Sequence, residues 1–164
     1  MSLEYVTGAD LRDHLVYLLN GGGAHLTFDQ AYADLPAHLR SAKPPGLPYT
    51  PWRLLEHMRI CQLDILDYCR NSKYVELSFP VDYWPAGDGP EREEDWEQCI
   101  TEYRRDLRAL VDLVKDPATN LLAEIPWGDG QTVLREALLV ADHNAYHLGQ
   151  MVAVRTLLGV EPDE

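Results

Sequence analysis

The sequence predicts an all-α protein that folds as a four-helix bundle. Apolar residues recur at the spacing of an α-helix in four long segments. Clusters of Gly and Pro separate these segments, and no stretch alternates apolar and polar residues as a half-buried strand does. The length of 164 residues suits one domain, and a hydrophobic content of 46% is enough to bury a core. We therefore expect residues 1–164 to form a single helical domain.

The first helix is predicted to begin at the sequence TGAD and to end before the three glycines at positions 21–23. Thr7 is suited to cap its amino end, and Asp10 to complete a capping box. Its apolar side is formed by Leu11, Leu15, Leu18 and Leu19. A loop-rich stretch then continues to Thr50, with a short helix expected around residues 28–33.

The second and third helices have clear boundaries in the sequence. Thr50 can cap the second helix, Pro51 occupies its first turn, and the helix is expected to extend to about Asn71. Residues 71–90 contain several prolines and glycines and are predicted to be irregular. The third helix is predicted over residues 91–115, with an acidic first turn that suits the helix dipole. Connections of this length allow crossovers, so the helices need not simply alternate in direction.

The fourth helix is predicted from about Thr132 to Leu158, with Gly159 as its stop. We interpret as its core face a regular apolar stripe that consists of Leu134, Leu138, Ala141, Ala145, Leu148 and Val152. His143 and His147 then fall on roughly the opposite side, which is also apolar. A helix with two apolar faces is expected either at the centre of a bundle or at a contact between subunits.

Two histidines four residues apart suggest a metal site, because their side chains lie one turn apart and their nitrogens can converge on one ion. His143 and His147 have this spacing. The alternative is a pair of hydrogen-bonded or exposed histidines. His57, inside the second helix, is the best candidate for a third ligand from a facing helix, and the alternative for it is a histidine at the edge of the core.

Two long segments resemble the DinB-like (YfiT-like) superfamily of metal-dependent proteins. They are PWRLLEHMRICQLDIL in the second helix and REALLVADHNAYHLGQMVAVRTLLG in the fourth, and the loop GDGQT and the tripeptide YWP are also similar to members of that group. The resemblance covers essentially the whole chain. It implies a four-helix bundle in up-down-down-up order, often dimeric, with a divalent metal ion held by three histidines. The matching residues here are His57, His143 and His147.

Three neutral imidazoles leave a divalent ion open to water or substrate, which permits either hydrolysis or thiol transfer. Asn144 stands where the zinc-peptidase motif HExxH has its glutamate, so a peptidase of that type is not expected. Asp64, seven residues after His57, is the candidate for a base or for a residue that supports the site, and its alternative is an exposed carboxylate. Imidazole suits several ions, so Zn or Ni is expected first and Fe or Mn remain open.

Several other side chains are expected near this site or at the ends of the bundle. Gln150 is expected at its edge, and Cys61 is expected to pack in the core rather than to bind metal. Tyr83, Trp84 and Trp127 are expected either to wall an apolar pocket or to cap the end of the core.

Charge and cysteine content limit the partners. The net charge of −13 argues against a nucleic-acid surface, and no Lys and Arg cluster or apolar run of 18 residues indicates a membrane. Three cysteines without CxxC spacing predict no disulfide framework and fit a reducing cytoplasm. We expect a homodimer that acts on a small molecule as a metal-dependent hydrolase or low-molecular-weight-thiol transferase. The alternative is a non-catalytic, stress-related dimeric bundle with a structural or vestigial metal site.

Overall fold

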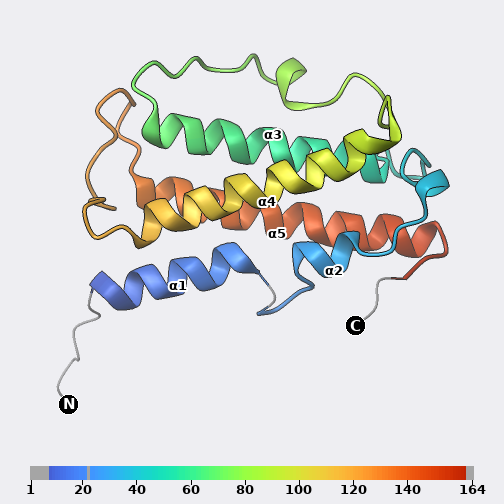
Figure 1. Cartoon of the computed structure of the whole chain (residues 1–164), viewed down its shortest axis with the longest axis horizontal. Helices are drawn as coiled ribbons and strands as arrows, with labels where there is room; N and C mark the ends of the chain where they lie inside the picture. The colour runs from blue at the N-terminus through green and yellow to red at the C-terminus, as the bar shows by residue number, and fades with distance from the viewer. Residues whose placement is uncertain (1–7, 22, 162–164) are drawn as a thin grey trace.

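The computed structural model describes residues 8–21 and 23–161 and confirms the all-α prediction for them. The described residues form five α-helices, two short 3-10 turns and no strand beyond one isolated bridge (Figure 1). The α-helices are α1 (Gly8–Asn20), α2 (Phe28–Tyr32), α3 (Pro51–Arg70), α4 (Glu93–Lys115) and α5 (Val133–Leu157). The turns are η1 (Ala37–Leu39) and η2 (Val81–Tyr83).

Local capping fixes where the long helices begin. The hydroxyl oxygens of Thr50 and Thr132 each accept a hydrogen bond from the backbone N–H three residues later, as predicted for the starts of α3 and α5. Helix α4 begins at Glu93, two residues later than predicted. The residue before it, Arg92, has an extended backbone and caps the helix by donating its backbone N–H to the carboxylate of Asp95. The predicted cap of the first helix, Thr7, lies outside the described residues.

The four long helices pack side by side, with α4 and α5 each in contact with both α1 and α3. Helix α3 packs against α4 and α5, α1 packs against the same two helices, and the short α2 packs against α5 (Figure 1). The connection over residues 71–92 runs back along the length of the bundle and brings η2 against α3. None of the helices in the described parts of the chain is long and apolar enough to cross a bilayer.

The core face predicted for α5 was wrong. Leu138, in the predicted stripe, is 44% exposed, whereas Ala137, Val140 and Met151 are almost completely buried on the side that carries the histidines. The remaining members of the stripe are partly buried, except for Leu148, which is buried. Four polar residues lie on the buried side and hide its apolar pattern in the sequence: Glu136, Asn144, His147 and Arg155.

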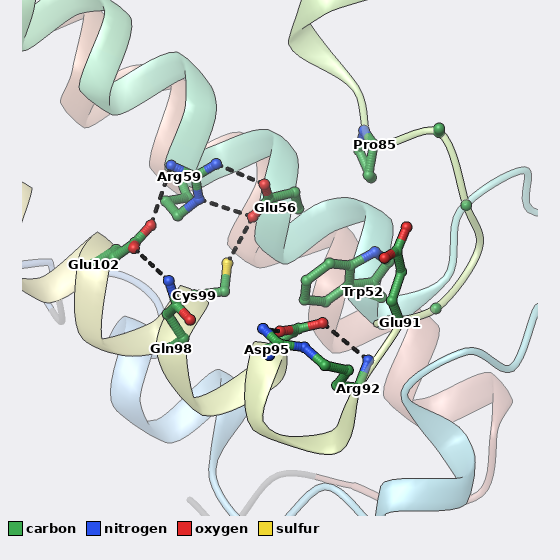
Figure 2. Close-up of a pocket in the computed structure, with 13 residues that line it drawn as sticks. Trp52, Glu56, Arg59, Pro85, Glu91, Arg92, Asp95, Gln98, Cys99 and Glu102 are labelled. Carbon is green, nitrogen blue, oxygen red and sulfur yellow. Dashed lines mark hydrogen bonds and ion pairs between the residues drawn. The ribbon is translucent and has the colours of Figure 1, made fainter.

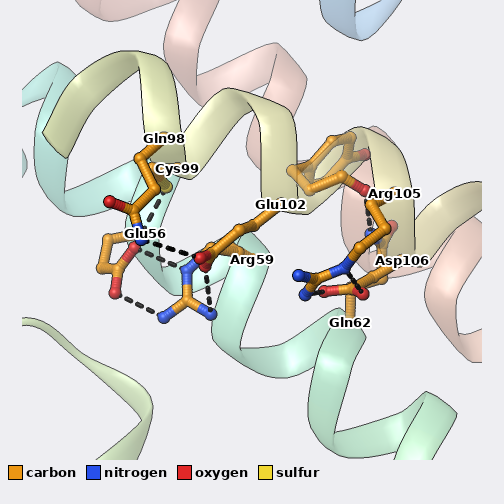
Figure 3. Close-up of polar contacts among 9 residues, drawn as sticks. Glu56, Arg59, Gln62, Gln98, Cys99, Glu102, Arg105 and Asp106 are labelled. Carbon is orange, nitrogen blue, oxygen red and sulfur yellow. Dashed lines mark hydrogen bonds and ion pairs between the residues drawn. The ribbon is translucent and has the colours of Figure 1, made fainter. Parts of the chain in front are cut away.

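The buried side-chain amide of Gln62 links helices α3, α4 and α5 near the centre of the bundle. Gln62 of α3 is 1% exposed, and its Nε2 donates to the backbone oxygen of Tyr103 in α4 at 2.8 Å. Its Oε1 accepts a hydrogen bond from Nδ2 of Asn144 in α5 at 3.1 Å. Figure 3 shows Gln62 at the contact between α3 and α4, near the ion pair of Arg105 and the buried Asp106. These contacts fix α3 relative to α5.

Candidate metal centre

Three histidines from two helices meet at one point. His57 comes from α3, and His143 and His147 lie one turn apart on α5. The Nε2 atom of His57 lies 3.1 Å from Nε2 of His147 and 3.2 Å from Nε2 of His143. All three predicted ligands are therefore brought together, and each presents the same nitrogen to the others.

The hydrogen-bond partners of Nδ1 fix which ring nitrogen carries the proton in His57 and in His147. Nδ1 of His57 lies 2.7 Å from the backbone oxygen of Tyr83, and Nδ1 of His147 lies 2.8 Å from Oε1 of Gln150. A carbonyl oxygen only accepts hydrogen bonds, so each Nδ1 carries the proton and each Nε2 of the neutral ring has a free lone pair. Two lone pairs facing each other at 3.1 Å repel unless a cation lies between them. This donor set fits a metal ion.

The spacing of the nitrogens also fits a shared ion. Imidazole nitrogens bound to one tetrahedral ion at about 2.0–2.1 Å lie about 3.3–3.4 Å apart. The two Nε2 separations from His57 are close to this value, and one nitrogen from each of the three rings lies within 4.8 Å of the others. His57, His143 and His147 thus form a group that can hold a divalent metal ion.

Burial keeps the three imidazoles in their neutral form. It is the main cause that lowers the pKa of His143 to about 3, and the neighbouring His147 and His57 lower it further. Burial also lowers the pKa of His147 to about 4, with a smaller contribution from His57, and it lowers the pKa of His57 itself. The neutral ring is the form that binds metal, so the site is prepared for an ion at neutral pH.

Aromatic residues of the 71–92 connection hold His57 in place. The ring of Trp84 stacks on His57 with ring centroids 3.8 Å apart and an angle of 1° between the planes. Tyr49 stacks on Trp84 at 5.3 Å. Of the two alternatives for Tyr83 and Trp84, the structure favours the aromatic wall, because both residues line the cavity beside the histidines. Trp127 lies elsewhere, and its Nε1 donates to the backbone oxygen of Tyr68.

Asp64 lies at the site but is already engaged. Its two carboxylate oxygens accept hydrogen bonds from the hydroxyls of Tyr74 at 2.8 Å and Tyr83 at 2.9 Å. Because the carbonyl of Tyr83 also holds Nδ1 of His57, Asp64 anchors the segment that orients this imidazole. A role for Asp64 as a base stays a prediction.

The three histidines lie at the base of a cavity of about 470 Å³. Its other lining residues are Cys61, Asp64, Ile65, Phe79, Tyr83, Trp84, Leu139 and Tyr146. Cys61 is buried with its Sγ 3.5 Å from Nδ1 of His57, and burial, followed by the charge of Asp64, raises the pKa of its thiol to about 12. It is therefore a neutral thiol that packs beneath His57, as expected.

The carboxylate that precedes His57 points away from the site. Glu56 faces a second cavity, of about 350 Å³, between α3, the 85–92 segment and α4 (Figure 2). There it forms an ion pair with Arg59 at 2.6 Å and accepts a hydrogen bond from the thiol of Cys99 at 3.0 Å, while Arg59 also reaches Glu102 (Figure 3). Adjacent residues of a helix point about 100° apart, which explains why Glu56 cannot share the histidine site.

The family comparison agrees with this geometry. Comparison with curated proteins and with solved structures finds no match for this chain. A family model described as the DinB superfamily matches residues 24–151, which include α2 to α4 and most of α5 with all three histidines. By this match over more than half of its length, the chain belongs to the DinB superfamily.

Proposed function

We propose that the protein is a metal-dependent enzyme that transfers a low-molecular-weight thiol to a small electrophile. The observation that supports this most is the meeting of three Nε2 atoms at the base of an open cavity. Zn or Ni is the expected ion, and Fe or Mn would also suit three imidazoles. When bound, such an ion supplies Lewis acidity, which lowers the pKa of a coordinated thiol or water toward neutrality.

The lining of the cavity favours thiol transfer over hydrolysis. The ion can activate either a thiol or a water, but hydrolysis of an ester or amide also needs a group that protonates the leaving oxygen or nitrogen. Asp64 is the one carboxylate among the described residues that line the cavity, and both of its oxygens accept hydrogen bonds from tyrosines. An ionised thiol that displaces a weakly basic leaving group such as a halide needs no such proton donor. The chain then has to orient His57 through the carbonyl of Tyr83 and the stacked ring of Trp84.

The activity test uses metal-loaded protein, a simple thiol and chlorodinitrobenzene as the electrophile. The sulfur forms a bond to the ring carbon, chloride leaves, and the thiol proton passes to the buffer. We expect turnover that depends on both metal and thiol, and an Asp64→Asn variant that retains more than a tenth of it. The same preparation is assayed with a nitrophenyl ester. A hundredfold loss of ester hydrolysis in a folded Asp64→Asn protein, without thiol transfer in the wild type, would instead favour the hydrolase.

We also infer that the protein is a cytoplasmic homodimer with its long helices in up-down-down-up order. The outer face of α5, where Leu138 is exposed beside partly buried Leu134 and Ala145, supports a subunit contact. The course of residues 71–92 along the bundle in Figure 1 supports α3 and α4 running in the same direction.

Sedimentation velocity tests the subunit contact, and it is expected to give a dimer at micromolar concentration for the wild type and a monomer for Leu138→Asp. A wild-type monomer would contradict the dimer.

A further inference from the structure

The cavity above the histidines is divided into two chemically different parts. The candidate metal-ligating nitrogens of the three histidines form its base. Its walls are apolar or aromatic and are formed by Ile65, Phe79, Trp84, Leu139 and Tyr146. The carboxylate of Asp64 accepts hydrogen bonds from the hydroxyls of Tyr83 and Tyr74. Among the described residues that line the cavity, none is Lys or Arg. The walls thus provide contact area for an apolar group but no counter-charge for an anion.

Two large aromatic side chains of the lining are exposed. Phe79 is 82% exposed and Tyr146 is 63% exposed. The ring of Tyr146 lies 5.0 Å from that of His147, and the ring of Phe79 lies 6.0 Å from that of Tyr83. The two therefore continue the aromatic surface from the histidines outward. A flat ring bound against either of them would cover apolar surface that is now in water, which is the main favourable contribution to binding of an aromatic group.

We propose that this cavity is the subsite for the uncharged, planar aromatic part of the electrophilic substrate. Its volume of about 470 Å³ is within the range of small-molecule sites, about 300–1,000 Å³. An acidic group on that part of the substrate is disfavoured, because the charged group in the wall is the carboxylate of Asp64, whereas the charge of a bound ion lies at the histidines, where the thiolate of the other substrate offsets it. The assignment rests on the proposed function, since it names the substrate that the thiol attacks.

Binding of two unreactive probes to metal-loaded protein, in the presence of a saturating simple thiol that occupies the open position of the ion, tests the assignment. The probes are neutral meta-dinitrobenzene and anionic meta-nitrobenzenesulfonate, which are similar in shape and ligate metals weakly. Their binding is followed by quenching of tryptophan fluorescence. We expect the neutral probe to bind at least tenfold more tightly. Equal binding, or tighter binding of the sulfonate, would overturn the proposal.

Three variants sharpen the test. Tyr146→Ala is expected to weaken binding of the neutral probe roughly two- to twelvefold, the loss of one aromatic contact of about 0.5–1.5 kcal/mol. The control Tyr17→Ala removes a tyrosine of similar exposure, 59%, that does not line this cavity, and it is expected to change nothing. Tyr146→Arg supplies the missing cation and is expected to improve sulfonate binding. Equal effects of Tyr146→Ala and Tyr17→Ala would count against the subsite.

The metal content of the same samples separates this proposal from the proposed function. Metal-loaded protein that transfers thiol but shows no preference for the neutral probe refutes the subsite alone. A protein that binds no metal refutes the proposed enzyme, and with it the assignment of the bound ring as its substrate.

Discussion

A protein that carries both His143→Ala and His147→Ala is expected to keep its helical fold and to lose its divalent ion. Only His57 of the three converging imidazoles remains, and one neutral ligand does not hold such an ion. Loss of a supporting residue alone typically weakens metal binding about 10–100-fold, so loss of two ligands should exceed a hundredfold. The measurements are metal content after purification without a nickel column, and titration of chelator-treated protein.

Thermal unfolding gives a second reading of the same prediction. An ion present at a hundredfold excess over its Kd is expected to stabilise the wild type by about 2.7 kcal/mol and the double variant not at all. The matched control is His25→Ala with His38→Ala, which removes two exposed histidines. It should leave both the metal content and the stabilisation by the ion unchanged. Stoichiometric metal in the ligand variant, or equal losses in the control, would contradict the assignment.

Replacing Gln62 with Leu is expected to destabilise the protein by about 2–4 kcal/mol. Asn144 is 5% exposed, its Oδ1 has no hydrogen-bond partner among the described residues, and its Nδ2 donates to Gln62. The variant therefore leaves a buried amide without that hydrogen bond, which costs about 1–3 kcal/mol, and it also breaks the contact with Tyr103. Urea unfolding of chelator-treated protein measures the change. Because Gln62 joins α3 to α5, metal affinity should also fall.

A double replacement separates the lost hydrogen bond from a change in packing. With Gln62→Leu and Asn144→Leu together, no side-chain amide is left without its partner, so the part of the lost stability that comes from Asn144 should return, while the contact with Tyr103 stays broken. The control Gln98→Ala removes an exposed glutamine of α4 and is expected to change stability by less than about 0.5 kcal/mol. If the double variant is less stable than the sum of the single variants predicts, the account of this contact is wrong.

The features that the sequence predicted correctly depend on neighbouring residues. Thr50 and Thr132 identify the starts of two helices because a cap contacts the backbone only three residues away. His143 and His147 suggested a metal site because a helix places residues four apart on one side. His57 could be added because it lies within another long helix, and the resemblance to the family pointed to the same residue.

The rest depends on contacts between distant segments. The buried side of α5 carries Asn144 and His147, so a search for a continuous apolar stripe selected the outer face instead. Nothing in the sequence indicates that the carbonyl of Tyr83 holds His57, or that the hydroxyl of the same tyrosine holds Asp64. Both contacts arise from the way the 71–92 connection lies across α3.

The most direct test of the account is a crystal structure of metal-loaded protein, with diffraction recorded on both sides of the absorption edge of the ion. We expect one ion bound by Nε2 of His57, His143 and His147 at about 2.0–2.2 Å, with its open position facing the cavity lined by Trp84 and Tyr146. An ion bound through other residues, or an ion that leaves any of the three histidines unligated, would contradict the account.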